Sequence, residues 1–83
     1  MVEKAIIILK LHREGIQTDL EVPLDITAND LIIALNEAYD LKIEVEDIRN
    51  CYLKMERPTA LLHGNKKLLE YGMRNGSVIH ITD

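Results

Sequence analysis

The sequence predicts an α+β domain in which one helix lies across one face of a mixed sheet of four to five strands. Three observations favour this class. Alternating apolar segments lie near both ends of the chain, one amphipathic segment lies between them, and the apolar residues, 47% of the 83, include no Phe or Trp. At this length we expect residues 1–83 to form a single domain with a core of Ile, Leu and Val.

The first third of the chain is expected to form a β-hairpin. Residues 4–12 (KAIIILKLH) are rich in β-branched residues, and residues 18–24 (TDLEVPL) alternate apolar with polar side chains. Gly15, between them, can adopt the positive φ that a tight turn needs. Pro23 cannot donate a ladder hydrogen bond, so the second strand is expected at an edge of the sheet.

A helix is expected next, because capping residues mark its start. Thr27 can act as the N-cap, and Asp30, three residues later, gives an acidic variant of the capping box. The helix is expected to end near Asp40. Apolar residues recur within it at helical spacing. The predicted core-facing positions are Leu31, Leu35 and Ala38, flanked by Ile32, Ala34 and Tyr39.

The remaining residues predict a connector and three short strands. Residues 41–50 (LKIEVEDIRN) form the connector, and their apolar side chains are expected to close the end of the core. Strands are expected over residues 51–56 and 60–63, a 3₁₀-like turn over 66–72, and a last strand over 77–82. Because the first and last strands are the most apolar, we expect both to lie inside the sheet.

Composition argues against several classes of partner. The net charge is −4, from 14 acidic and 10 basic residues without a basic stripe, so nucleic acid is not expected as a partner. No apolar stretch is long enough for a secretory signal or a membrane span, which favours a cytoplasmic protein without direct membrane insertion. The single cysteine, Cys51, cannot form an internal disulfide and is interpreted as a buried structural thiol.

No catalytic, cofactor or metal site is expected. His12, His63 and His80 lie in three different segments, without the spacing of a metal-binding motif. The sequence contains neither a Gly-rich phosphate loop nor a grouping of nucleophile and base. The acidic connector residues fit either a solvated loop or a surface that steers a basic partner; they are Glu44, Glu46 and Asp47.

The segment LLEYGMRNGSVIHI, residues 68–81, places an acidic residue and a Tyr after two apolar residues and then an Asn-Gly turn before an alternating strand. With the hairpin and the capped helix, it resembles the ubiquitin β-grasp fold, and most closely the YukD/EsaB family of bacterial ubiquitin-like proteins associated with type VII (WXG100) secretion. The positions that carry the resemblance are Leu68, Leu69, Glu70, Tyr71, Asn75, Gly76, Ile79 and Ile81.

This resemblance implies a cytosolic accessory component that is not an enzyme. Its protein partner would be the cytosolic domain of a type VII secretion membrane component. Members of the family lack the carboxy-terminal diglycine of ubiquitin, and this sequence ends Ile81-Thr82-Asp83. Since activation by an adenylating enzyme needs an unhindered terminal glycine, we expect no conjugation through Asp83.

Two alternatives stay open for the function. One is a tail-less relative of the sulfur-carrier or modifier proteins that works with an adenylating enzyme. The other is a β-grasp domain excised from a larger protein.

If the helix covers one face of the sheet, alternation divides the strand residues between two faces. The expected core residues are Ile7, Leu9, Leu11, Ile79 and Ile81. The opposite face is the candidate protein-binding surface, since contiguous apolar residues often mark interaction sites. It comprises Ile6, Ile8, Lys10, Tyr52, Lys54, Val78 and His80. Alternatively, its isoleucines only reflect β-propensity, or a weak homodimer covers them.

Overall fold

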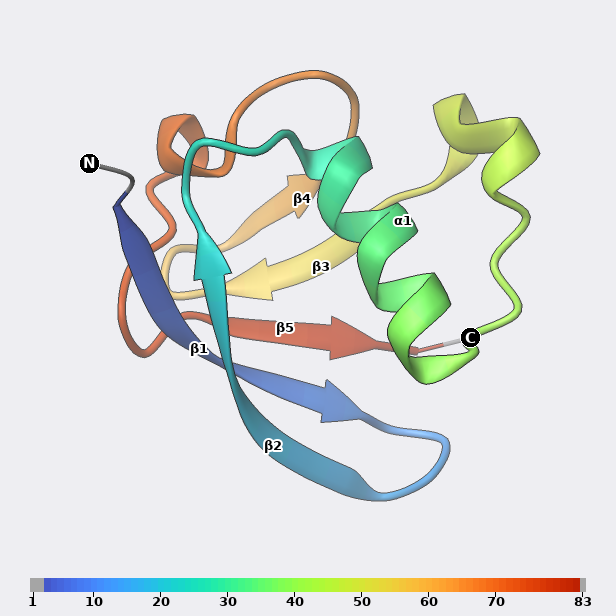
Figure 1. Cartoon of the computed structure of the whole chain (residues 1–83). Helices are drawn as coiled ribbons and strands as arrows, with labels where there is room; N and C mark the ends of the chain where they lie inside the picture. Colours follow the sequence, from blue (N-terminus) through green and yellow to red (C-terminus); the bar gives the residue numbers. More distant parts are fainter. Residues whose placement is uncertain (1–2, 83) are drawn as a thin grey trace.

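In the computed structural model, which describes residues 3–82, a five-stranded mixed sheet carries one α-helix across one face (Figure 1). The predicted α+β class is confirmed. The expectation for Asp83 lies outside the described residues. The elements are β1 (Lys4–Leu11), β2 (Ile16–Pro23), α1 (Ala28–Tyr39), the 3₁₀ segment η1 (Val45–Asn50), β3 (Leu53–Glu56), β4 (Ala60–Leu62), the 3₁₀ turn η2 (Leu68–Tyr71) and β5 (Val78–Ile81).

The strands lie in the order β2-β1-β5-β3-β4. β1 and β5 run parallel, whereas the other neighbouring pairs run antiparallel. The first and last strands therefore lie inside the sheet, as their apolar character predicts. β2, which ends at Pro23, is an edge strand, and this prediction is also confirmed.

The helix packs on the sheet through one stripe of its surface. A helix turns by about 100° per residue, so residues three and four apart share a face. The prediction for Ala38 was wrong: this residue is exposed, and the half-buried Tyr39 packs against the core at that end of the stripe. Ile32, expected on the flank, is 0% exposed. The buried helix residues are Ala28, Leu31, Ile32 and Leu35.

The sheet contributes the core residues that alternation predicts. Ile7, Leu9 and Ile79 are 0% exposed and Leu11 is 4% exposed, while Ile81, at the end of β5, is half-buried. The connector also closes one end of the core as expected, because Leu41, Ile43 and Ile48 pack against this cluster.

Element boundaries differ from the predicted ones where hydrogen bonding, not alternation, decides them. β2 begins at Ile16 because it pairs with β1 directly after the turn. β3 begins only at Leu53, which is paired with β4, so Cys51 and Tyr52 precede the strand. The connector contains η1, a 3₁₀ segment that its acidic, irregular sequence did not predict.

The start and end of α1 are fixed as the sequence predicts. Thr27 Oγ1 accepts a hydrogen bond from the Asp30 N–H, and the Thr27 N–H donates to Asp30 Oδ2, each over 3.1 Å. Asp40 ends the helix in the left-handed region, with φ 51°. Such a capping box contributes about 1 kcal/mol to helix stability.

Tyr71 and Glu70, in the motif that carries the family resemblance, hold loops in place. The Tyr71 hydroxyl donates to the His63 carbonyl over 2.7 Å and accepts from the His63 N–H over 3.3 Å, which ties η2 to the end of β4. Glu70 Oε2 accepts from the Lys67 N–H over 2.9 Å and so caps η2. The Lys66 ammonium lies 4.8 Å from the Tyr71 ring centroid.

Asn75 and Gly76 join the turn before β5 to β1. Asn75 Oδ1 accepts from the Ile6 N–H over 2.8 Å, and the Gly76 N–H donates to the Ile6 carbonyl over 3.0 Å. Gly76 has φ +89°, a conformation that only glycine adopts without strain. The turn therefore continues the pairing of β1 beyond the start of β5.

Ser77 also stabilises this turn through two hydrogen bonds of its hydroxyl group. Its side chain is 0% exposed, and its hydroxyl donates to the Arg57 carbonyl over 2.7 Å while accepting from the Arg74 N–H over 3.0 Å. One buried hydroxyl thus joins the start of β5 to the turn that follows β3.

The first prediction concerns Ser77→Ala, which leaves two backbone groups without their partner. We expect the free energy of unfolding to fall by about 1–3 kcal/mol, measured by urea denaturation. The control is Thr59→Ala at an exposed position, expected to change stability by under about 0.5 kcal/mol. Equal losses in the two variants would show that the Ser77 hydrogen bonds are not stabilising.

Candidate interaction surface

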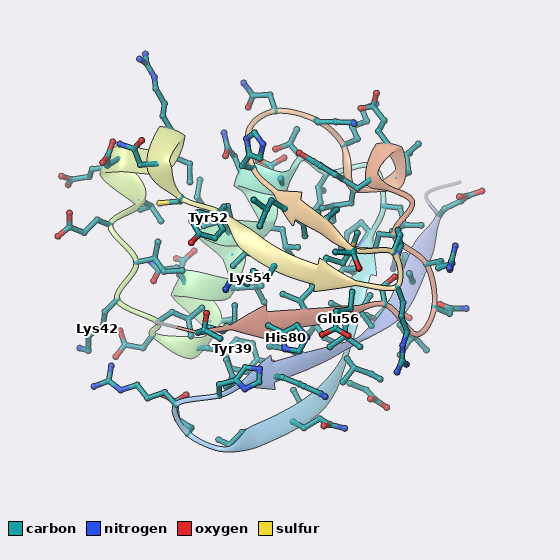
Figure 2. The ribbon with its side chains drawn as sticks, turned by 180° about the vertical axis from the view of Figure 1, so that it is seen from behind. Tyr39, Lys42, Tyr52, Lys54, Glu56 and His80 are labelled. Atoms are coloured by element: carbon teal, nitrogen blue, oxygen red, sulfur yellow. The ribbon has the colours of Figure 1, made fainter. Side chains whose placement is uncertain are left out.

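The face of the sheet opposite α1, called the open face below, is seen in Figure 2. The strand register places two rows of side chains across its centre. One row contains Ile8, Val78 and Glu56, and the other contains Lys10, His80 and Lys54. Ile6 lies two residues before Ile8 on β1, and Tyr52 lines one hollow together with Lys54 and His80. The structure thus gathers the seven predicted residues on one side of the sheet.

These residues differ in exposure. Ile6 is 53% and Tyr52 55% exposed, and Lys54 is also exposed. Ile8 and Lys10 are half-buried, and the His80 side chain is 15% exposed. The accessible apolar area therefore lies toward the rim of the open face.

Val78 does not offer the exposed surface that we expected. It is on the open face by register, but only 3% of it is exposed. Val78 is a short side chain on an inner strand, and its cross-strand neighbours, Ile8 and Glu56, are longer. The predicted contiguous patch of Ile6, Ile8 and Val78 is therefore broken at its centre.

A chain of three polar side chains occupies that centre. His80 Nε2 lies 2.6 Å from Glu56 Oε1, and His80 Nδ1 lies 2.7 Å from His12 Nε2. The two rings stack, with centroids 4.9 Å apart and planes 23° apart. A carboxylate only accepts, so His80 Nε2 donates to Glu56; when His80 is neutral, its Nδ1 then accepts the N–H of His12. Figure 2 shows Glu56 and His80 side by side.

Leu61 adds an exposed apolar residue to the open face. It is paired with Lys54, points to the same side and is 53% exposed. Beside it lies a shallow hollow of about 530 Å³, also lined by Lys54 and His80. A second hollow, of about 270 Å³, lies between Tyr52 and the connector. Both hollows include Lys54 and His80, which stand between them.

The sequence analysis missed His12, Glu56 and Leu61. Leu61 could have been assigned to the open face from the alternation of residues 60–62, once β4 was paired with β3. His12 and Glu56 become neighbours of His80 only through the pairing of β1, β5 and β3. No local pattern in the sequence indicates that pairing.

Cys51 is a partly buried thiol that packs against the core. Its Sγ–H faces the carbonyl oxygens of Glu44, 3.6 Å away, and Asp47, 3.5 Å away. Desolvation by burial, and then the charges of Asp47 and Glu44, raise the pKa of Cys51. Because the thiolate is the nucleophilic form, this environment suits a structural thiol.

The side-chain hydrogen bonds of His12 and His80 join imidazole to imidazole and imidazole to carboxylate. Within residues 3–82, the side-chain hydrogen bonds of His12 and His80 lead to each other and to Glu56, not to a hydroxyl or thiol. In the same range, no three His, Cys, Asp or Glu side chains are placed to hold a metal ion. Nor is any helix of the described part of the chain long and apolar enough to span a membrane.

The second prediction concerns the hydrogen-bonded chain. In the neutral His80 ring we expect the proton to lie on Nε2, as detected by long-range ¹H–¹⁵N NMR spectra. Glu56→Ala removes the acceptor and should shift the His80 ring signals, whereas the connector variant Glu46→Ala should not. A proton on Nδ1 in the wild type would contradict this geometry.

The third prediction concerns Cys51. Since its pKa is raised, the thiolate fraction near neutral pH is below that of an ordinary cysteine. Alkylation by iodoacetamide, followed by intact mass spectrometry, should be slower for the folded protein than for the urea-unfolded chain or for glutathione. The idea fails if the folded protein reacts as fast as glutathione.

Solved structures similar to this chain include ubiquitin-like domains. The domain from tubulin-binding cofactor B has 19% identity and a TM-score of 0.73, covering 96% of this chain and 89% of that one. The domain of Plasmodium falciparum Dsk2 has 21% identity and a TM-score of 0.63, covering 96% and 100%. The carboxy-terminal domain of mouse tubulin-specific chaperone e has 16% identity and a TM-score of 0.71, covering 95% and 84%. At such identities the likeness shows the ubiquitin-like fold alone.

The family assignment comes from the sequence. No curated protein matches the chain. Residues 6–81 match the family described as "WXG100 protein secretion system (Wss), protein YukD", a span that includes the helix and all of β2 to β5. Residues 68–81, which carried the predicted resemblance, lie inside this match. The chain therefore belongs to the YukD family of the WXG100 protein secretion system.

Proposed function

We propose that this chain is a non-catalytic, ubiquitin-like docking module in the cytoplasm. Its open face would bind the cytosolic domain of a membrane component of the WXG100 secretion system. Membership of the YukD family supports the link to that system. The geometry supports binding by protein contact, since the candidate surface is a sheet face that α1 leaves uncovered (Figures 1 and 2).

The observation that carries this proposal is the exposure of large apolar side chains on the open face. Ile6, Tyr52 and Leu61 are each more than half exposed, at 53%, 55% and 53%. They come from three segments, and they surround the polar chain formed by His12, His80 and Glu56. A partner would gain affinity by burying these apolar side chains, and the hydrogen-bonding groups between them would fix its orientation.

The same surface argues for binding without covalent chemistry. Glu56 and His80 form an acid–imidazole pair, but general base catalysis also requires a positioned nucleophile or substrate proton. In the described part of the chain, the hydrogen-bonded chain ends at His12. The pair therefore fits a role in positioning the face rather than in a reaction.

The fourth prediction tests docking on the open face. Tagged wild type, Ile6→Asp and Leu61→Asp are used to capture partners from detergent-solubilised membranes of the native cell. A carboxylate in an apolar contact is costly, so recovery of a secretion-system membrane protein should fall about tenfold or more in both variants. Mass spectrometry of the captured protein gives its identity and amount.

Ile33→Asp is the matched control. Ile33 lies on α1 and is 42% exposed, so it receives the same change on the opposite side of the molecule. It should capture the partner like wild type. Equal capture by all variants would rule out the open face as the contact. If Ile6→Asp instead abolishes a concentration-dependent dimer in sedimentation velocity, with no membrane partner, the face is a homodimer contact.

A further inference from the structure

A row of cationic and imidazole side chains crosses the centre of the open face. Lys10 on β1 lies opposite His80 on β5, and His80 lies opposite Lys54 on β3. Directly paired residues point to the same side of a sheet. Adjacent strands are about 4.8 Å apart, so the Cα atoms of Lys10 and Lys54 are separated by roughly 10 Å.

Within the described part of the chain, the two lysines of this row have no carboxylate partner. Within residues 3–82, Lys4 is paired with Glu21 and Lys42 with Asp40, but neither Lys10 nor Lys54 forms an ion pair. The carboxylate in the neighbouring row, Glu56, is bonded to His80 over 2.6 Å. Within the described residues, neither ammonium group of this row is therefore neutralised by an ion pair.

Other carboxylates of the open face lie on the edge strand β2, where Asp19 is a diagonal neighbour of Lys10 without forming an ion pair with it. Asp19 is paired with Ile8, and Glu21 is paired with Ile6 and held 3.7 Å from Lys4. Thus a protein with a net charge of −4 has, at the centre of its open face, a strip in which no ion pair within residues 3–82 neutralises Lys10 or Lys54. The carboxylates of an acidic partner would be attracted to the two lysines of this strip, whereas the cations of a basic partner would be repelled by them.

An apolar hollow adjoins the strip. The hollow of about 530 Å³ is lined by Lys54, His80, Ala60 and Leu61, and also by Glu56, whose carboxylate is already bonded to His80. It is large enough for an apolar side chain, and Lys54 is one of its lining residues. A ligand for this place therefore combines an apolar anchor with a nearby negative charge.

We propose that the open face binds an acidic segment of a protein. An apolar side chain of that segment occupies the hollow beside Leu61, and its carboxylates pair with Lys10 and Lys54. The inference deepens the proposed docking function and rests on it. A nucleic acid or an anionic membrane fits less well, because such polyanions are bound by larger clusters of Lys and Arg, on the order of 4–8, on a basic surface.

The test uses three synthetic ten-residue peptides in which leucine alternates with glutamate, glutamine or lysine. Each is titrated into ¹⁵N-labelled protein, and amide shifts are followed by NMR. We expect the glutamate peptide to shift resonances of residues 10, 54, 61 and 80 and to bind at least about tenfold more tightly than the other two. Raising the salt from about 50 to 500 mM should weaken this binding, because the Debye length shortens.

Charge-reversed variants locate the contact. Lys10→Glu/Lys54→Glu should lose the glutamate peptide and gain affinity for the lysine peptide. Lys42→Glu/Lys67→Glu makes the same change in net charge outside the open face and should bind like wild type. Equal loss in both double variants would mean that only net charge matters, and equal binding of the glutamine peptide would mean that only the apolar side chains matter. Either result overturns the inference.

Two further outcomes separate this inference from the docking function. If phosphatidylglycerol vesicles or poly(U) bind to the Lys10 and Lys54 strip and the glutamate peptide does not, the ligand class is wrong. If Lys10→Glu/Lys54→Glu still captures the membrane partner that Ile6→Asp and Leu61→Asp lose, the docking function is supported and the proposed contact with an acidic segment is wrong. If the Asp variants retain the partner, the docking function itself falls.

Discussion

The parallel pairing of β1 with β5 is the constraint on which the rest of the molecule depends. It joins the start of the chain to its end, with Leu9 beside Ile79 in the core and Lys10 beside His80 on the other side. Parallel strands need a long crossover connection and gain most when both faces are shielded from water. Here α1 shields one face, while on the other the side chains of neighbouring strands cover one another, which explains why Val78 is buried without a helix above it.

Most of the fold could be predicted because its determinants are local. The capping box at Thr27, the alternation in β1 and the proline at the end of β2 each act within a few residues, and each gave the observed element. The candidate site was predicted less well, because its character depends on register between distant strands. Alternation placed seven residues on the open face, but it could not show that Val78 is covered or that His12 contacts His80.

That difference changes the chemistry assigned to the surface. An uninterrupted patch of Ile6, Ile8 and Val78 would select any apolar partner and would favour self-association. The observed face instead has a polar centre, where the hydrogen bond from His80 to Glu56 fixes which nitrogen of His80 faces His12. Its large exposed apolar side chains lie outside this centre. Fixed donors and charges contribute more to orientation and to choice of partner than to affinity. If the open face is the docking surface proposed above, charge placement as well as burial would select its partner.

The residues of the motif that indicates the family stabilise the fold. Family membership therefore implies the ubiquitin-like fold, but it does not specify the charges on the open face. Tyr71 ties η2 to β4, Glu70 caps η2, and Asn75 joins the last turn to β1. None of the three belongs to the seven predicted surface residues. A chain could therefore keep the whole motif, and with it the ubiquitin-like fold, while its open face carried other charges. Because the motif specifies the scaffold, the proposed choice of partner would rest on the side chains of β1, β3, β4 and β5 that face away from α1, above all on the row of Lys10, His80 and Lys54.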